Sequence, residues 1–461
     1  MSKGRKGAII LSIAVFIVAI LVWWVASKFG LTGASAELDR QLTAAKQDGL
    51  PVSADELRGG QVRDDDNAAA LVLNQAQAIK DIPGDPCGVL LAWGSTYSNK
   101  PVTNDEAARA INQLQPVLQA TIEASRRPHL DFQFQWEKGS RLNMPGLALV
   151  KQLVKILVAE SRLHRLQGHS ELSLEPLLAA SRLSHLLSET PCVIAMLVEI
   201  ACEAIVQREA SDVARADSDP KILNGIREVL KGFGPMPDFK KSLKGDFVMF
   251  LVEAPRMGYM SDAHVSAMDD TVYPTEWKLM RLKPVQALNE SVAVRDFRKV
   301  FECAPCETVP YAVSVQKMNE RYRLMDSESP LSSMASSVYN HIGAQAVAAW
   351  TSCLARRRVL NAGLDILEHR NRSKAFPFVW SQPGPNGLDP FTDKPLAYHR
   401  TDASFVVYSF DKDLQDDGGR PYVADDGQNR QDISFEYPKL SVRPLTPSKK
   451  TKGPSGGMSG D

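Results

Sequence analysis

Three consecutive segments between residues 145 and 216 carry apolar side chains at helical spacing, and this pattern constrains the fold more than any other feature. In the first segment, Leu147, Val150, Val154 and Leu157 lie on one face of a helix. Short turns join the three segments. The helices must therefore pack antiparallel, because their apolar faces would otherwise be exposed to water.

Local signals mark the ends of these helices. Gly168 is placed to end the first helix, Ser173 to cap the second, and Pro191 to open the third. Ser53 and Thr103 each begin a capping-box pattern, in which a glutamate follows three residues later. Helical spacing also occurs from Thr103 to Pro128 and at 220–232, 240–253, 286–302, 311–325 and 332–370. We therefore expect a mainly α fold built from helix hairpins.

Two parts of the chain predict extended structure. Residues 132–136 alternate apolar and polar side chains, which indicates extended chain or a short strand. The composition changes at Phe376, where proline, glycine and aromatic residues replace alanine and leucine. Residues 396–400 and 405–410 predict a hairpin with a four-residue turn, and 433–437 a third strand. We therefore expect a helical domain at 28–375, a small antiparallel β module at 376–440 and a disordered tail at 441–461.

An uninterrupted apolar run from Ala8 to Ala26 follows three basic residues. Such a run is long enough to cross a membrane, and the positive-inside rule places the basic end in the cytoplasm. The prediction is a transmembrane helix at 8–27 with residues 1–7 cytoplasmic. The remainder would lie outside the cytoplasm of the inner or plasma membrane. The alternative is a signal peptide cleaved after Ala36, because Ala34-Ser35-Ala36 has the small-x-small form.

Charge and cysteine content exclude some classes of function. The formal net charge is zero, so the chain has no basic excess to hold nucleic acid. Six cysteines are compatible with disulfides outside the cytoplasm. Cys303 and Cys306 form the only close pair, which leaves a structural disulfide, two buried thiols or a redox pair open.

Two segments are similar to known families. The run Asp389-Pro-Phe-Thr-Asp-Lys-Pro-Leu-Ala-Tyr398, followed by 405–410 and Asp416-Asp-Gly-Gly419, resembles the C-terminal element of type II secretion pseudopilins. Aspartate stands at Asp393, where that family commonly has glycine. The resemblance implies a shared small β module with an acidic loop that can hold calcium.

The layout as a whole resembles an uncharacterised family of bacterial membrane-anchored helical proteins. The pieces that carry this resemblance are the apolar N-terminal run, Gly49-Leu-Pro51, Asp66-Asn-Ala-Ala69, the helical middle and residues 389–395. It implies topology and no particular chemistry.

The acidic loop is the candidate metal site. Clustered aspartates beside Gly418 and Gly419 can supply the six to eight oxygens that calcium prefers, although their spacing does not match an EF-hand. A solvated acidic turn is the alternative. The predicted calcium ligands are Asp411, Asp413, Asp416 and Asp417.

Helical Glu/His pairs are a second candidate. Glu160/His164 and His185/Glu189 have i,i+4 spacing, and Glu199 lies on the next helix. A bundle can hold metal ions with such residues, but the i,i+3 spacing of di-iron proteins is absent. Ser314-Val-Gln-Lys317 has the S-x-x-K form of penicillin-interacting enzymes without their partner motifs.

No sequence motif specifies a reaction, so we expect a non-enzymatic scaffold or interaction protein with a protein partner in the cell envelope. Paired amphipathic helices suit such binding. Two alternatives remain. One is an accessory of a secretion or pilus-like system, and the other is a hydrolytic or metal-dependent envelope enzyme. A polar pocket that gathers Glu160, His164, His185 and Glu199 would favour the enzyme.

Overall fold

The computed structural model describes residues 27, 32–93, 102–253, 283–307, 309, 311–317, 320, 333–382, 384–419 and 432–438. These residues form a stack of helices with one three-stranded antiparallel sheet. The longer helices are α2 (Ala34–Gln47), α4 (Ala69–Asp81), α5 (Pro86–Trp93), α6 (Asn104–Gln113), α7 (Gln115–Ser125), α8 (Pro145–Leu166), α9 (Leu174–Leu186), α10 (Val193–Ala216), α11 (Pro220–Gly232), α12 (Phe239–Phe247), α16 (Lys283–Glu302) and α18 (Ser333–Ser373).

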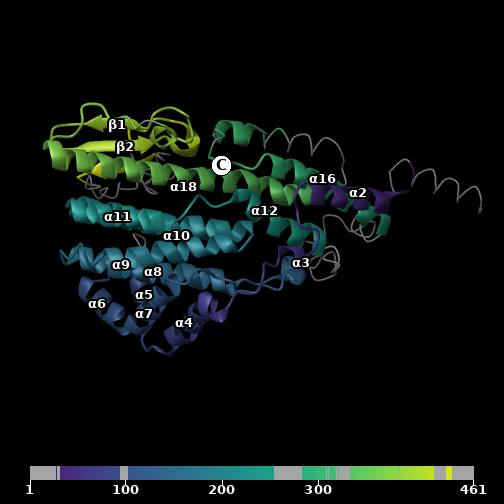
Figure 1. The fold of residues 1–461 in the computed structure, drawn as a ribbon, viewed down its shortest axis with the longest axis horizontal. Helices are drawn as coiled ribbons and strands as arrows, with labels where there is room; N and C mark the ends of the chain where they lie inside the picture. Colours follow the sequence, from purple (N-terminus) through teal and green to yellow (C-terminus); the bar gives the residue numbers. More distant parts are fainter. Residues whose placement is uncertain are drawn as a thin grey trace, which may run out of the picture.

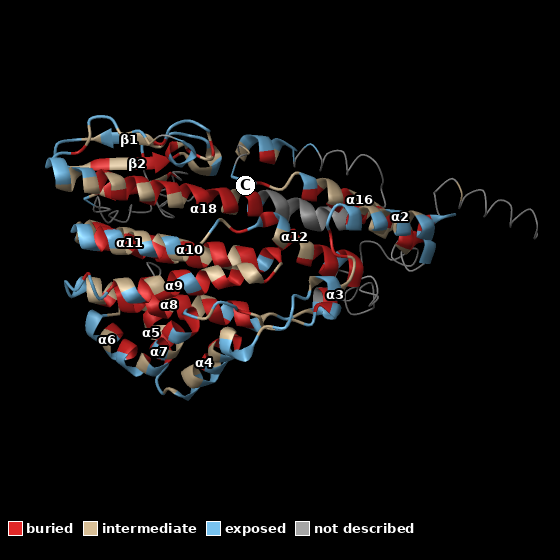
Figure 2. Cartoon of the chain, in the orientation of Figure 1, coloured by how far each residue is buried: buried red, intermediate tan, exposed pale blue. Residues whose placement is uncertain are grey.

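The helices are arranged in successive layers (Figure 1). Helices α4 to α7 form the outermost layer, followed by α8 with α9, then α10 with α11, then α18. The sheet covers the face of α18 opposite α10. A second group, made of α2, α12, α16 and the first half of α18, lies beside these layers and has its own apolar core. Buried residues concentrate on α8, α9, α10 and α18 (Figure 2).

The predicted three-helix block is confirmed, and α8, α9 and α10 pack on one another. Gly168 follows α8 with φ of 80°, a left-handed conformation that glycine adopts without strain. Ser173 does not cap α9. Its hydroxyl donates instead to the carbonyl of Ser161 at 3.0 Å. Pro191 lies two residues before α10, and Cys192 occupies the N-cap position.

Two other local predictions are corrected. The helix expected from Thr103 to Pro128 is broken at Leu114 into α6 and α7, because Pro116 lacks the N–H that a continuous helix needs. The capping box of Thr103 with Glu106 is present. Residues 132–135 form no strand, and the Phe132 ring packs against Gly146 at the start of α8.

Helix α18 joins the two apolar cores. Its 41 residues span roughly 60 Å. Val347, Trp350 and Leu354 belong to the core shared with α2, α12 and α16. Leu360 and Leu364, one or more turns later, belong to the larger core of the layered helices. The apolar stripe predicted for 332–370 is therefore confirmed wherever its side chains are described.

The predicted hairpin and third strand are confirmed as β1 (Ala397–Arg400), β2 (Phe405–Ser409) and β3 (Ile433–Tyr437), in the order β1-β2-β3. Phe405, Val407 and Phe435 join the larger core against α18. Gly363 of α18 lies under the Phe435 ring, where a Cβ atom would collide with it. The sheet therefore shares the core of the helices.

The predicted fold class is corrected in one respect. No helix in the described part of the chain has both the length and the apolar character needed to cross a membrane. The described part of the chain is therefore mainly helical with a small antiparallel sheet, and the expected transmembrane helix is not among its helices. The predicted segment 8–27 lies outside the described residues except for Ser27, as does the tail 441–461.

Candidate functional site

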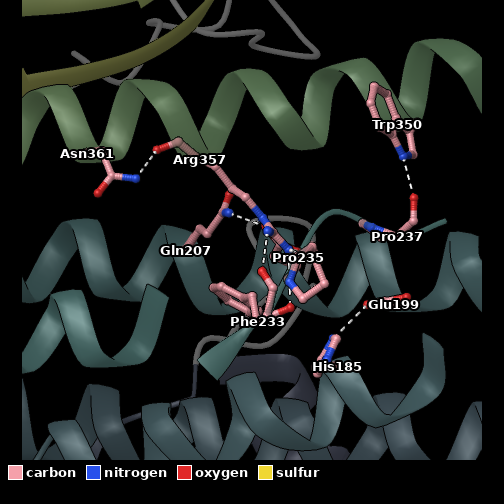
Figure 3. Close-up of polar contacts among 11 residues, drawn as sticks. His185, Glu199, Gln207, Phe233, Pro235, Pro237, Trp350, Arg357 and Asn361 are labelled. Carbon is pink, nitrogen blue, oxygen red and sulfur yellow. Dashed lines mark hydrogen bonds and ion pairs between the residues drawn. The ribbon is translucent and has the colours of Figure 1, made fainter. Parts of the chain in front are cut away.

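Charged and polar side chains meet inside the stack, between α9, α10 and α18 (Figure 3). Glu199, Glu203 and Gln207 follow one another at i,i+4 spacing on α10, so they share one face of that helix. His185 comes from the last turn of α9, and Arg357 comes from α18. We call these five residues the interior polar cluster.

Arg357 forms a two-point ion pair with Glu203. Its Nε and Nη2 atoms lie 2.6 and 2.8 Å from the two carboxylate oxygens, and Glu203 is 1% exposed. Its Nη1 donates to the carbonyl of Gly234 at 2.8 Å. Burial by itself lowers the pKa of Arg357, but hydrogen bonding to Glu203 and the charge of that carboxylate raise it overall. The charged guanidinium thus ties α18 to α10 and to the turn after α11.

Glu199 is the member of the interior polar cluster whose carboxylate lacks a hydrogen-bond partner. It is 1% exposed, and neither of its carboxylate oxygens has a hydrogen-bond partner. The Nδ1 atom of His185 lies 3.6 Å from Oε1, too far for a hydrogen bond. Burial raises the pKa of Glu199 to about 7, although His185 opposes the shift. Glu199 can therefore take up or release a proton near neutral pH.

The turn that receives Arg357 is built for close contact. Gly234 has φ of 61°, and a Cβ atom there would collide with the His185 ring. Trp350 donates its Nε1–H to the carbonyl of Pro237 at 2.8 Å, which fixes the same turn to α18 a second time. The interior polar cluster therefore acts first as a connection between layers. Chemically, it offers one titratable carboxyl group beside one histidine.

Comparisons with known proteins give no relative. No protein-family model, no curated protein and no solved structure matches this chain.

The structure brings together only two of the four residues expected in an enzymatic pocket, His185 and Glu199. Glu160 instead accepts a hydrogen bond from Gln115 at 3.2 Å, and burial raises its pKa. His164, near the end of α8, has a buried Nδ1 without a hydrogen-bond partner. In the described part of the chain, no group of three or more His, Cys, Asp or Glu side chains is placed to hold a metal ion.

The four predicted calcium ligands lie after β2, in and behind the short helical turn η6 (Asp411–Asp413). Three of their carboxylates accept hydrogen bonds from protein groups: Asp411 from Ser352, Asp413 from the amide of Gln415, and Asp416 from Tyr408 and the amide of Gly418. Calcium binding stays a prediction. A titration with calcium that gives neither heat nor a shift in melting temperature would retire it.

Of the remaining sequence candidates, Cys353 lies beside Glu203 of the interior polar cluster, and burial together with the Glu203 charge raises the pKa of its thiol. None of the six cysteines, all of which lie in the described part of the chain, forms a disulfide, and of the close pair Cys303 is half-buried and Cys306 exposed. Ser314 is buried, whereas Lys317 three residues later is exposed, so the S-x-x-K pair does not share one environment. Sequence reasoning missed Arg357. The run Arg356-Arg357-Arg358 inside an apolar helix was the available signal, since charges in such a place need partners.

Proposed function

We propose that this protein is a non-enzymatic scaffold that binds another protein through the connection between α18 and β1. The observation that carries the proposal is the exposure of two apolar side chains there. Phe378 is 86% exposed and Val379 is 80% exposed. Large exposed apolar groups that lie side by side are typical of interaction sites.

The helical surfaces are less suited to this role than the sequence indicated. The apolar stripes of α8, α9 and α10 are buried against neighbouring helices, so they are already used within the protein. The connection 376–380 differs because Phe378 and Val379 are exposed, whereas Phe376 is buried in the larger core and anchors the segment. It is the better candidate for contact with a partner.

The surface is held in place before any partner arrives. The Arg400 guanidinium lies 3.9 Å from the centre of the Phe378 ring and donates to the carbonyl of Phe376 at 3.1 Å. Tyr398 donates its hydroxyl to the carbonyl of Pro377 at 2.8 Å. Aromatic residues and arginine are enriched among residues that dominate binding energy, and a preformed surface lowers the entropic cost of binding. We expect the partner to offer an apolar pocket for Phe378.

The test is purification of the tagged full-length protein from its own cells, with mass spectrometry of the proteins that remain bound. We expect one protein in stoichiometric amount with the native chain and its loss with Phe378→Ala. Ile194→Ala is the matched control, because Ile194 is 56% exposed on helix α10, away from the connection between α18 and β1. Recovery of the native chain alone, or equal recovery of the same partner with Phe378→Ala, would contradict the proposal.

An accessory role in secretion is the second candidate. It is favoured by the turn at 389–395, which leads into the hairpin as the similarity to pseudopilins implies. Recovery of secretion-apparatus proteins in the same purification would support this role. Recovery of an unrelated partner would support the general scaffold function and contradict the secretory role.

A further inference from the structure

A small cavity lies where three distant parts of the chain meet. Its volume is about 70 Å³, and it is lined by residues 305–307, 309, 311 and 314, by the middle of α18 and by residues 390 and 393. Tyr311, Trp350 and Leu354 supply apolar walls. Its polar lining includes Ser314, Arg358, Glu307 and Asp393. The cavity is separate from the surface around Phe378.

Two buried donors in this lining have no acceptor. Arg358 is 6% exposed, and its Nη1 donates to the carbonyl of Leu388 at 2.9 Å, but its Nε has no hydrogen-bond partner. Ser314 is 1% exposed, and its hydroxyl also has no partner. Buried polar groups in proteins are nearly always hydrogen-bonded. Two unpartnered donors that line one cavity therefore point to an acceptor supplied by a ligand.

The mouth of the cavity carries carboxylates, which are acceptors, in contrast to the donors in the buried part of the lining. Glu307 and Asp393 both line it with exposed side chains, and neither forms an ion pair within the described part of the chain. Asp393 is held in a left-handed conformation with φ of 59°, and its amide donates to the carbonyl of Asp389 at 2.8 Å. Carboxylates at the mouth favour a cation, whereas the donors deeper inside favour an anion.

We propose that the cavity binds a small zwitterion of the amino-acid type. Its carboxylate would accept hydrogen bonds from Arg358 and Ser314, and its ammonium group would donate to Glu307 and Asp393. Arginine and a carboxylate form strong charge-assisted hydrogen bonds. The volume limits the enclosed part of the ligand to a few heavy atoms, so glycine is the first probe.

The inner end is tested by calorimetric titration of glycine into the native chain and into Ser314→Ala. We expect binding to the native chain and a loss of affinity of roughly fivefold or more in Ser314→Ala, since one hydrogen bond is removed. The variant keeps its fold because the lost hydroxyl has no protein partner. Ser291→Ala is the matched control, because Ser291 is equally buried but bonds only within α16. Equal affinity of Ser314→Ala and the native chain would overturn the proposal.

The mouth of the cavity is tested with acetate and methylammonium, each of which carries one of the two charged groups of glycine. Acetate and methylammonium should each bind the native chain more weakly than glycine. The double variant Glu307→Gln with Asp393→Asn should bind glycine roughly tenfold more weakly than the native chain does, while its affinity for acetate is not lowered. Asparagine tolerates the left-handed conformation at position 393. Absence of heat with glycine, or acetate binding as tight as glycine, would contradict a zwitterion site.

Discussion

At the scale of single residues, Glu199 couples the stability of the protein to pH. Its pKa is raised by burial from the usual 4.5 to about 7. Between these two pH values, the folded state therefore keeps the proton on Glu199, whereas the unfolded state has released it. Stability from this group is fully present below pH 4.5 and is lost as the pH rises through about 7. His185, Glu203 and Arg357 are the charged or titratable groups around it.

We therefore expect Glu199→Gln to raise the free energy of unfolding at pH 8 by on the order of 1–3 kcal/mol, with little effect at pH 4.5. Urea unfolding measured across this pH range checks the prediction. Glu171→Gln, at an exposed position, is the control. A variant whose pH dependence matches that of the native chain would show that Glu199 does not titrate as described.

Asp389 is a second residue whose role is local and testable. It is 2% exposed and accepts hydrogen bonds from the amide and side-chain donors of four residues: Phe391, Thr392, Ser409 and Phe410. Asp389→Asn replaces one acceptor oxygen by a donor, so two donors then face each other. We expect a loss of about 2 kcal/mol or more in unfolding free energy. Asp402→Asn, in the exposed hairpin turn, should change it little, and an equal effect of both would contradict this account.

At the scale of elements, the start of α10 and the helix α12 are in backbone contact. A Cβ atom at Gly245 would collide with the carbonyl oxygen of Pro191, and the neighbouring Asp246 accepts a hydrogen bond from the amide of Val193 at 3.2 Å. Only glycine permits this approach. The pairing of the two elements therefore depends on one missing side chain.

We expect Gly245→Ala to lower the melting temperature and to cost about 2–3 kcal/mol, because the backbone must move to make room. Gly225→Ala is the matched control. There the new methyl group meets only the end of the Leu174 side chain, and alanine favours a helix over glycine by about 1 kcal/mol. Thermal unfolding that shows equal losses for both variants would refute the contact.

At the scale of the whole molecule, the layers are joined by a buried ion pair as well as by apolar contact. Arg357→Met leaves Glu203 charged and nearly inaccessible to water, which we expect to cost about 3–5 kcal/mol. The double variant Arg357→Met with Glu203→Met should recover at least half of this loss, because the unpaired charge is gone. Urea unfolding of the two single variants and the double variant measures the coupling. A double variant less stable than Arg357→Met would contradict the expected coupling.

The sequence by itself determined which residues form helices and strands and which sides they bury. Apolar spacing on 145–216 and 332–370 is a local property, and so is the turn between 400 and 405, which explains why α8, α9, α10, α18 and the hairpin were predicted. Local signals were insufficient where a single residue competes with the pattern around it. Pro116 divides a helix that periodicity joins, and Ser173 bonds to another helix instead of its own.

Only the tertiary structure decided which charges meet. Glu203 and Arg357 are 154 residues apart, and periodicity on either helix carries no information about the other. The same holds for Ser314 and Arg358, which line one cavity although they lie on separate segments of the chain. The physical reason is that burial of apolar faces fixes the packing first. The polar groups carried on those faces then find partners that no local pattern specifies.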